Sequence, residues 1–385
     1  MSREASNMSL QHKSVKFKSY LLRGVSAATI TIALGFSSSV YAAGDDADAT
    51  TDVNTGATVT ATDAGGLLNN DPADHAITID STAGAITLGT LATTDAVTFK
   101  DDIGGTRTAT YTITTSGTNN AVTFAGDIEA EGDEIIVLNA TNTTTVFTGD
   151  VTVATGSATL TLGAGTSTIS TTFDTATAAS NIIDMAINAN AAGDTVTLQV
   201  TNTDGTVGNG MTFSQAIGGG SAATAIDSLS LGTATKATFS STVRADAITS
   251  NTTQTTTFTG AVTANSFTGT GTGATTLTGG GTFGSLSAAG NVTSGTGALD
   301  INGTVAISGG DLVIGSGDAT LSGAAITADN ITLAAGNDIT FDGTAAQTVT
   351  GLVDGGGAVT LTNTSGVTFA NAIGATTPIG ALTIG

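Results

Sequence analysis

The sequence predicts an all-β protein, and within that class a parallel β-helix (β-solenoid) of about 15 coils. Three observations lead to this prediction: apolar and small polar residues alternate with period two, Gly and Asn clusters interrupt the alternation, and one pattern of Phe, Val, Leu and Gly recurs. Period-two alternation is typical of β-strands, and the clusters indicate turns. An array of β-sandwich-like units is the ordered alternative, and an unstructured low-complexity chain is the other.

The predicted strands are short runs rich in Val, Ile, Leu and Thr, for example 158–162, 195–200 and 330–333. Such residues favour strands, and stretches with helical period are essentially missing. The turns between the strands need residues that adopt positive φ. Candidates for these turns are Asn209-Gly210, Gly218 to Gly220, Gly279 to Gly281 and Gly355 to Gly357.

A repeat supports the solenoid over the alternatives. Phe is followed four residues later by Val or Ile, and because positions i and i+4 of a strand share a face, each pair is expected to point into one core. The pairs are Phe99/Ile103, Phe124/Ile128, Phe147/Val151, Phe213/Ile217, Phe239/Val243, Phe258/Val262 and Phe369/Ile373.

The repeat extends beyond the Phe pairs. Counted from Phe147 and from Phe369, Leu stands at +13, Leu or Ile at +15 and Gly at +16. A third copy begins at Phe213 and ends at Gly232, with 218–224 as an expanded loop. Stacked coils would bury these apolar side chains on one another, and the spacings suggest about 23 residues per coil.

The amino end, residues 1–42, is expected to be a signal peptide. The apolar run Val25 to Phe36 is too short to span a membrane, and Val40-Tyr41-Ala42 offers small residues before a cleavage site. The positive region before it contains Arg3, Lys13, Lys16, Lys18 and Arg23. Export through the inner membrane follows from this expectation.

Composition excludes several classes of partner. The whole chain has a net charge of -22, and removal of the signal would leave only four basic side chains, Lys100, Arg107, Lys236 and Arg244. Nucleic acid is therefore excluded as a partner, because its binding needs clustered Lys or Arg. The chain has no Cys, so neither disulfides nor thiol-bound metals contribute. No later segment is long and apolar enough for a transmembrane helix.

The predicted organisation has three parts. After the signal, residues 43–66 carry Asp45, Asp46, Asp48, Asp52 and Asp63 and few large apolar side chains, which indicates a polar leader or an amino-terminal cap. Residues 67–385 form the repetitive β-solenoid. Because the chain stops at Leu382-Thr-Ile-Gly385 inside a repeat, we expect it to be truncated at its carboxy end.

Candidate catalytic and metal residues are few, and we expect no catalytic, cofactor-binding or metal site. His75 beside Asp71 and Asp74 lacks a second His or Cys, so it is expected to be an exposed turn residue. Lys236 and Arg244-Ala-Asp246 are the one place for a polysaccharide-acting site.

Calcium is a weaker cofactor alternative for the whole chain. It rests on the acidic cluster Asp127, Glu129, Glu131, Asp133 and Glu134, since Ca²⁺ needs several converging oxygens. Gly315-Ser-Gly-Asp318 is only a fragment of the glycine-rich calcium repeat.

The carboxy-terminal unit resembles the repeat of bacterial surface proteins of the autotransporter and filamentous-haemagglutinin type. The matching positions are Phe369, Ile373, Gly374, Pro378, Ile379, Leu382 and Ile384. The long basic region before the apolar run is similar to the extended signals of those proteins. The resemblance implies a right-handed β-helical passenger at the Gram-negative cell surface, often adhesive, whose outer-membrane anchor would lie in a missing carboxy-terminal part.

Together these observations lead us to expect a structural or adhesive surface stalk and not an enzyme. Its partners would be host or neighbouring-cell surface molecules, or other copies of itself. A self-associating surface-layer or biofilm-matrix protein is the alternative, and a β-helical polysaccharide-acting enzyme is the second alternative.

Overall fold

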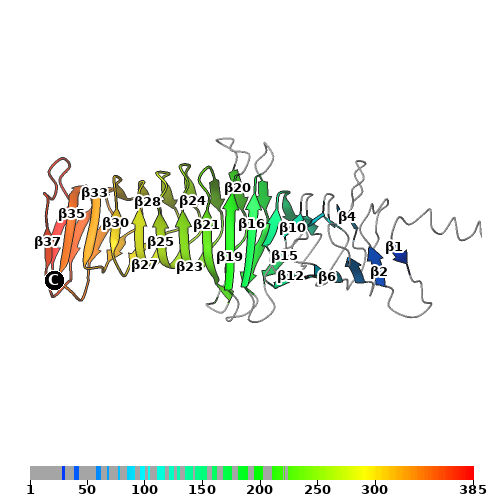
Figure 1. Cartoon of the computed structure of the whole chain (residues 1–385). Helices are drawn as coiled ribbons and strands as arrows, with labels where there is room; N and C mark the ends of the chain where they lie inside the picture. Colours follow the sequence, from blue (N-terminus) through cyan, green and yellow to red (C-terminus); the bar gives the residue numbers. More distant parts are fainter. Residues whose placement is uncertain are drawn as a thin grey trace, which may run out of the picture.

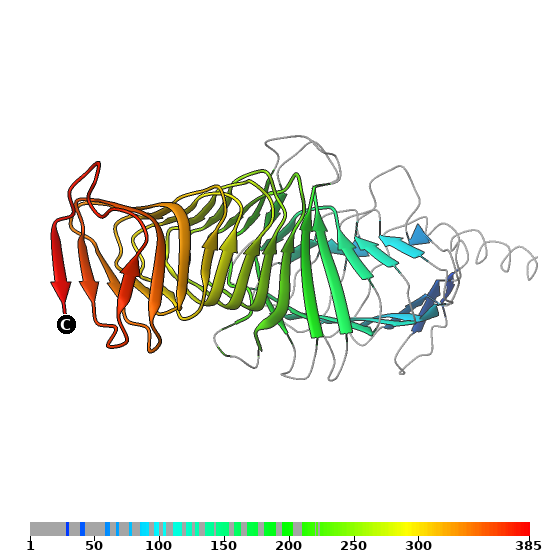
Figure 2. The same cartoon turned by 60° about the vertical axis from the view of Figure 1, so that its left-hand side comes forward.

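Parallel strands stack into a β-helix, as the sequence predicts. The computed structural model describes a series of strands between residues 28 and 213 with gaps between most of them, residues 214–219 and 221, and every residue from 224 to 385. The part from 224 onward makes about eight turns. Its coils lie side by side along one axis and form a rod (Figure 1; Figure 2).

Each coil crosses three faces of the rod. We name them by the side chains that point outward from residue 210 onward: a row of Thr on the threonine face, rows of Ser, Thr and Ala on the serine face, and Thr with charged residues on the mixed face. The chain passes from the mixed face to the serine face and then to the threonine face. Several strands run across a corner and belong to two faces, so that 30 strands join one large sheet. Only β1 and β2 pair antiparallel; the other described pairings are parallel.

The mixed face begins with a separate sheet of eight strands. These strands are β1 (Ala28–Ile30), β2 (Ser39–Ala42), β3 (Thr58–Ala61), β6 (Ala85–Leu91), β9 (Tyr111–Gly117), β12 (Ile135–Thr141), β15 (Ala158–Leu162) and β18 (Met185–Ala189). The bridges Ile187 to Ile217 and Ile217 to Val243 continue this face. It is completed by the first halves of β23 (Val243–Ser250), β25 (Val262–Gly269) and β27 (Gly281–Ala288), and by β29 (Leu299–Ile301), β32 (Ala319–Leu321), β34 (Asp338–Phe341), β36 (Ala358–Leu361) and β38 (Ala381–Ile384).

The serine face contains the second halves of β23, β25 and β27. Its other strands are β4 (Leu67–Leu68), β7 (Ala96–Phe99), β10 (Ala121–Phe124), β13 (Thr144–Phe147), β16 (Thr168–Asp174), β19 (Thr195–Thr201), β21 (Ile226–Leu231), β30 (Val305–Ile307), the first halves of β33 (Ala325–Leu333) and β35 (Gln347–Gly355), and β37 (Val367–Phe369).

The threonine face contains the second halves of β33 and β35. Its other strands are β5 (Ile77–Thr78), β8 (Ile103–Gly104), β11 (Ile128–Ala130), β14 (Val151–Val153), β17 (Asn181–Ile183), β20 (Gly210–Phe213), β22 (Lys236–Phe239), β24 (Thr256–Phe258), β26 (Thr275–Leu277), β28 (Val292–Ser294) and β31 (Leu312–Ile314).

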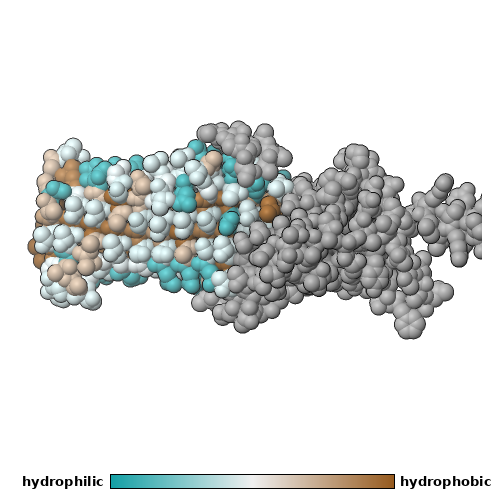
Figure 3. Space-filling view, in the orientation of Figure 1, coloured by the Kyte–Doolittle hydropathy of each residue, from teal (hydrophilic) through white to brown (hydrophobic). Residues whose placement is uncertain are grey.

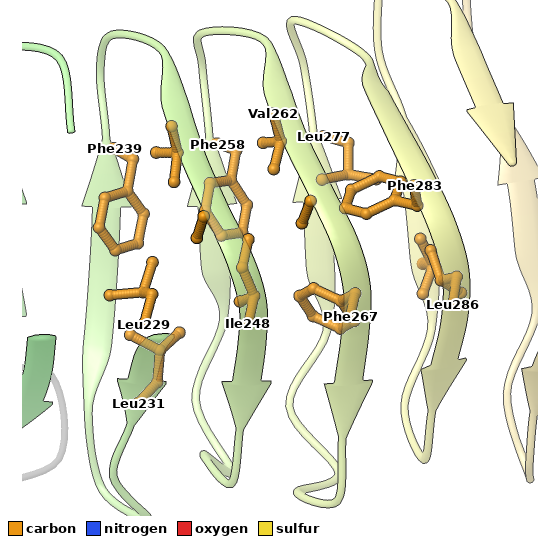
Figure 4. Close-up of a cluster of buried hydrophobic side chains, with 14 of the residues drawn as sticks. Leu229, Leu231, Phe239, Ile248, Phe258, Val262, Phe267, Leu277, Phe283 and Leu286 are labelled. Carbon is orange, nitrogen blue, oxygen red and sulfur yellow. The ribbon is translucent and has the colours of Figure 1, made fainter. Parts of the chain in front are cut away.

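One narrow apolar core runs through the coils. In three-residue strands such as β24, β29 and β31 the two outer residues are buried and the central one is partly exposed, as the predicted alternation requires. Figure 4 shows Phe, Leu, Ile and Val side chains from successive coils pointing into the same interior. Because each coil lies directly on the next, the apolar side chains of one coil are buried by those of its neighbours.

Five of the predicted Phe and Val or Ile pairs, from Phe124/Ile128 to Phe258/Val262, are buried in the core, but the predicted reason for this was wrong. Phe147 ends β13 and Val151 begins β14, so the pair lies on two strands and not on one face of a single strand. The three residues between them turn the chain through a corner. Both side chains are buried because both strands face the same interior.

The third copy of the repeat lies one face further along the coil than the other two. Phe147 and Phe369 end strands of the serine face, whereas Phe213 ends β20 on the threonine face. Phe213 is in register with Ile183 and Phe239. The Phe column therefore crosses from one face to the other, and the rings of Phe173 and Phe213 meet edge to face at 5.5 Å.

The coils are not of one length. Phe124 is in register with Phe147, a coil of 23 residues as predicted, but Asp246 and Asn265 are neighbours only 19 residues apart. Later coils need 17 to 23 residues, and most are close to 20. The predicted coil length is thus too long for the carboxy-terminal half, while the predicted total of about 15 coils includes stretches outside the described residues.

Glycine acts at the corners in two ways. The predicted positive φ is present at Gly218 (81°), Gly219 (53°), Gly280 (77°) and Gly355 (121°). A second role was not predicted: a Cβ added to Gly297 would lie 2.0 Å from the carbonyl oxygen of Gly279, in the coil below. At these corners the backbones of successive coils touch, so no side chain fits between them.

The predicted domain boundaries stay predictions. Most of the expected signal peptide and of the polar leader lies outside the described residues. Within them, β2 and β3 stack in register and β3 pairs with β6. In the described part of the chain no helix is both long and apolar enough to span a membrane.

Candidate functional site

The residues singled out for chemistry do not come together in the described part of the chain. His75, Asp71 and Asp74 lie outside it, as do Asp127, Glu131, Asp133 and Glu134. Glu129 is the middle residue of β11. Among the described residues, no group of three or more His, Cys, Asp or Glu could hold a metal ion.

Lys236 and Arg244 lie on different faces. Lys236 is exposed at the start of β22 on the threonine face, and Arg244 is the second residue of β23 on the mixed face. Asp246 stands at the next corner, where its Oδ1 accepts a hydrogen bond of 3.2 Å from Nδ2 of Asn265. No ion pair joins Lys236 or Arg244 to an acid of the described residues, and the two bases lie on different strands, so the described residues do not bring together the group of bases and acids predicted for a polysaccharide-acting site.

Aspartates at the corners fasten one coil to the next. Asp318, the acid of the calcium-repeat fragment, accepts a hydrogen bond of 2.9 Å from the backbone N–H of Asp338. Asp311 accepts one of 2.8 Å from the side chain of Asn330. Buried Asp354 accepts hydrogen bonds from the backbone N–H groups of Thr376 and Thr377 and so holds the loop before β38. The corners therefore use these acids as hydrogen-bond acceptors.

The outward side chains of the three faces differ. On the threonine face one row of Thr runs up the rod through Thr212, Thr238, Thr257, Thr276 and Thr293. The corresponding row of the mixed face reads Arg244, Thr263, Thr282, Asp300 and Thr320. The mixed face therefore carries charge within its row, whereas this part of the threonine row is uncharged.

The serine face is wider, because each of its strands turns two residues outward from β21 to β35. The first row is Ser228, Ala247, Ser266, Ser285, Thr304, Ala325 and Thr348. The second row is Ser230, Thr249, Thr268, Ser287, Ala306, Thr327 and Thr350. Both rows consist only of Ser, Thr and Ala, and none of these side chains is buried.

The sequence analysis missed this double row. A signal for it exists in the triplets Ser228-Leu-Ser230, Ser266-Phe-Thr268, Ser285-Leu-Ser287 and Thr348-Val-Thr350, in which a buried residue separates two small polar ones. Similar triplets are common throughout this Thr-rich chain. Only the register between coils shows that these particular triplets lie on one face.

Comparisons with protein-family models, with curated proteins and with solved structures find no match. The functional interpretation therefore depends on the residues and on the geometry of the rod.

Proposed function

We propose that the chain is an exported, non-enzymatic rod that serves as a structural or adhesive stalk at the surface of a Gram-negative cell. The observation that carries the proposal is the unbroken stack of coils from residue 224 to 385, with one core and short corners. At about 4.8 Å per coil, about eight coils give a rod roughly 40 Å long for this part alone. A rod of this kind holds its two ends at a fixed distance.

The described faces support display and contact more than catalysis. Their outward residues are small and mostly uncharged, and the two basic side chains of the continuous part lie apart on different faces. Catalysis of sugar cleavage needs acids and bases within a few ångströms of one bond. A repeated surface instead offers many weak contacts of the same type, which suits adhesion through multivalency.

Export is the part of the proposal that rests on the sequence alone. The test is a comparison of the full chain with an Ile30→Arg/Leu34→Arg variant in a Gram-negative host, because charges in the apolar run block signal recognition. We expect only the unaltered chain to leave the cytoplasm, and Lys13→Gln serves as the control that keeps the apolar run. Retention of the unaltered chain in the cytoplasm would contradict the proposal.

The shape is tested separately on the purified chain. Small-angle scattering and negative-stain images should show an elongated particle, and circular dichroism should show β-structure that resists protease. A globular or rapidly cleaved particle would contradict the stalk.

A further inference from the structure

The serine face combines periodicity with the absence of charge. Its two rows repeat once per coil, at about 4.8 Å, over seven consecutive coils. The side chains differ only between Ser, Thr and Ala, so the face is close to flat. Long or charged side chains, which would hold a second surface away, are missing from these rows.

The charges of the continuous part lie outside these two rows. Asp227, Asp246 and Asp342 stand before the first row, and Asp329 stands at the corner after the second. Figure 3 shows the hydrophilic side chains gathered mostly along the upper and lower edges of the rod, with pale and brown rows between them. The chain has a net charge of -22, so a second molecule with the same charge is repelled by acidic side chains. The serine face is the widest of the three faces, and its outward rows carry no such side chain.

We propose that two copies of this chain pair side by side through their serine faces. A second copy fits because it presents the same spacing between rows, so that the side chains of one rod enter the gaps of the other along the whole face. Small side chains allow two sheets to approach closely and to interdigitate, as they do in dry β-sheet interfaces. The aspartates then lie at the rim of the contact, where water screens them.

The size of the face determines the strength of the pairing. Seven coils by two outward residues give roughly 30 Å by 10 Å, so a pair buries well under the 1,200 Å² of a standard stable interface. A single pair of rods is therefore weakly held. Many rods on one surface add their contacts, and the pairing becomes effective between crowded surfaces.

The test uses the full chain coupled at high density to beads, with bead clustering as the readout. We expect clustering of the wild-type chain. The variant Thr268→Glu/Ser287→Glu adds negative charge to the middle of the serine face and should reduce clustering at least about tenfold, because like charges then oppose each other across the contact. The matched control Thr257→Glu/Thr276→Glu places the same charges on the threonine face of neighbouring coils and should cluster as the wild type does.

A bulky uncharged variant and the dependence of clustering on salt test the same contact in two further ways. Ser287→Tyr adds a bulky, uncharged side chain that would keep the two faces apart, and Tyr is favourable in a strand. This variant should therefore reduce clustering, and it tests the proposal even if circular dichroism shows that the double Glu variant does not fold. Added NaCl should strengthen clustering, since it screens the aspartates at the rim. The proposal is wrong if wild-type beads stay dispersed, if both Glu variants behave alike, or if a chelator abolishes clustering, which would indicate cation bridges between the acidic corners.

Discussion

The two halves of the described rod fill the same kind of core in different ways. Between Phe124 and Phe258 the coils are mostly long, and Phe rings of successive coils contact each other with centroids 4.8 to 5.5 Å apart, stacked except for the edge-to-face pair Phe173 and Phe213. From Val262 onward most coils are shorter, at about 20 residues, Leu, Ile and Val supply most of the core, and glycines form many of the corners. Long coils leave space for rings, whereas short coils need corners without side chains.

The comparison shows that a coil's length and its core residues must change together. Gly281 illustrates the coupling in a single position, because a Cβ there would lie 2.4 Å from the ring of Phe283 in the same strand. In this coil the ring of Phe283 occupies the space that a side chain at position 281 would need. Four substitutions would test whether the two halves depend on these different features.

The largest effect is expected for Phe213→Ala in the aromatic half. Phe213 is buried, and its ring contacts both Phe173 and Phe239 at the point where the Phe column changes face. Loss of a buried ring should lower the free energy of unfolding by about 4 kcal/mol. Hydrogen exchange of β20 and β22 measures the effect locally, and Phe213→Leu is the milder control. A loss below about 1 kcal/mol would show that the column does not stabilise this half.

The glycine corners of the other half should respond to a single methyl group. Gly297→Ala places a Cβ against the backbone of Gly279 and should cost about 3 kcal/mol, since backbone cannot move aside. Gly309 is the matched control: its φ is 75°, but nothing lies within 4 Å of the added Cβ, so Gly309→Ala should cost about 1 kcal/mol. A loss for Gly297→Ala no larger than that for Gly309→Ala, measured by thermal unfolding, would mean that close approach between coils does not require a glycine at position 297.

A smaller effect is expected at Gln347, a polar residue whose side-chain amide is buried. The Nε2 of Gln347 donates to the carbonyl oxygens of Leu321 and Gly323, at 2.8 and 3.0 Å, and its Oε1 accepts from Nδ2 of Asn363. Gln347→Leu removes these hydrogen bonds and the one that Oε1 accepts from the backbone N–H of Gly343, and it should cost about 2 kcal/mol. The exposed neighbour Thr348 provides the control, since Thr348→Ala should leave the free energy of unfolding within about 0.5 kcal/mol of wild type.

The smallest effect is expected at an exposed corner acid. Asp318→Ala removes the acceptor for the backbone N–H of Asp338, and water can replace it, so the loss should be about 0.5 kcal/mol. Chemical unfolding with and without calcium checks a second point. Calcium that stabilised the wild type but not Asp318→Ala would contradict the role of Asp318 as a hydrogen-bond acceptor alone.

Much of the fold could be predicted from local pattern, and the candidate surface could not. Alternation around Leu299 to Ile301, or around Leu312 to Ile314, is visible in any window of a few residues. The double row of the serine face is not, because Ser266 and Ser285 become neighbours only through the register of β25 with β27. The same Ser or Thr spacing elsewhere in the chain lies on other faces.

The sequence by itself determined that this is a stack of short β-strands with an apolar side facing inward, because period two and β-branched composition act within one strand. The tertiary structure decided which face each strand occupies and why each corner glycine is needed. Phe147 and Phe213 have the same local pattern but different faces, and Gly297 has ordinary φ but no space for a side chain. Both facts depend on contacts between residues of different coils. These residues are distant in sequence and meet only when the coils stack.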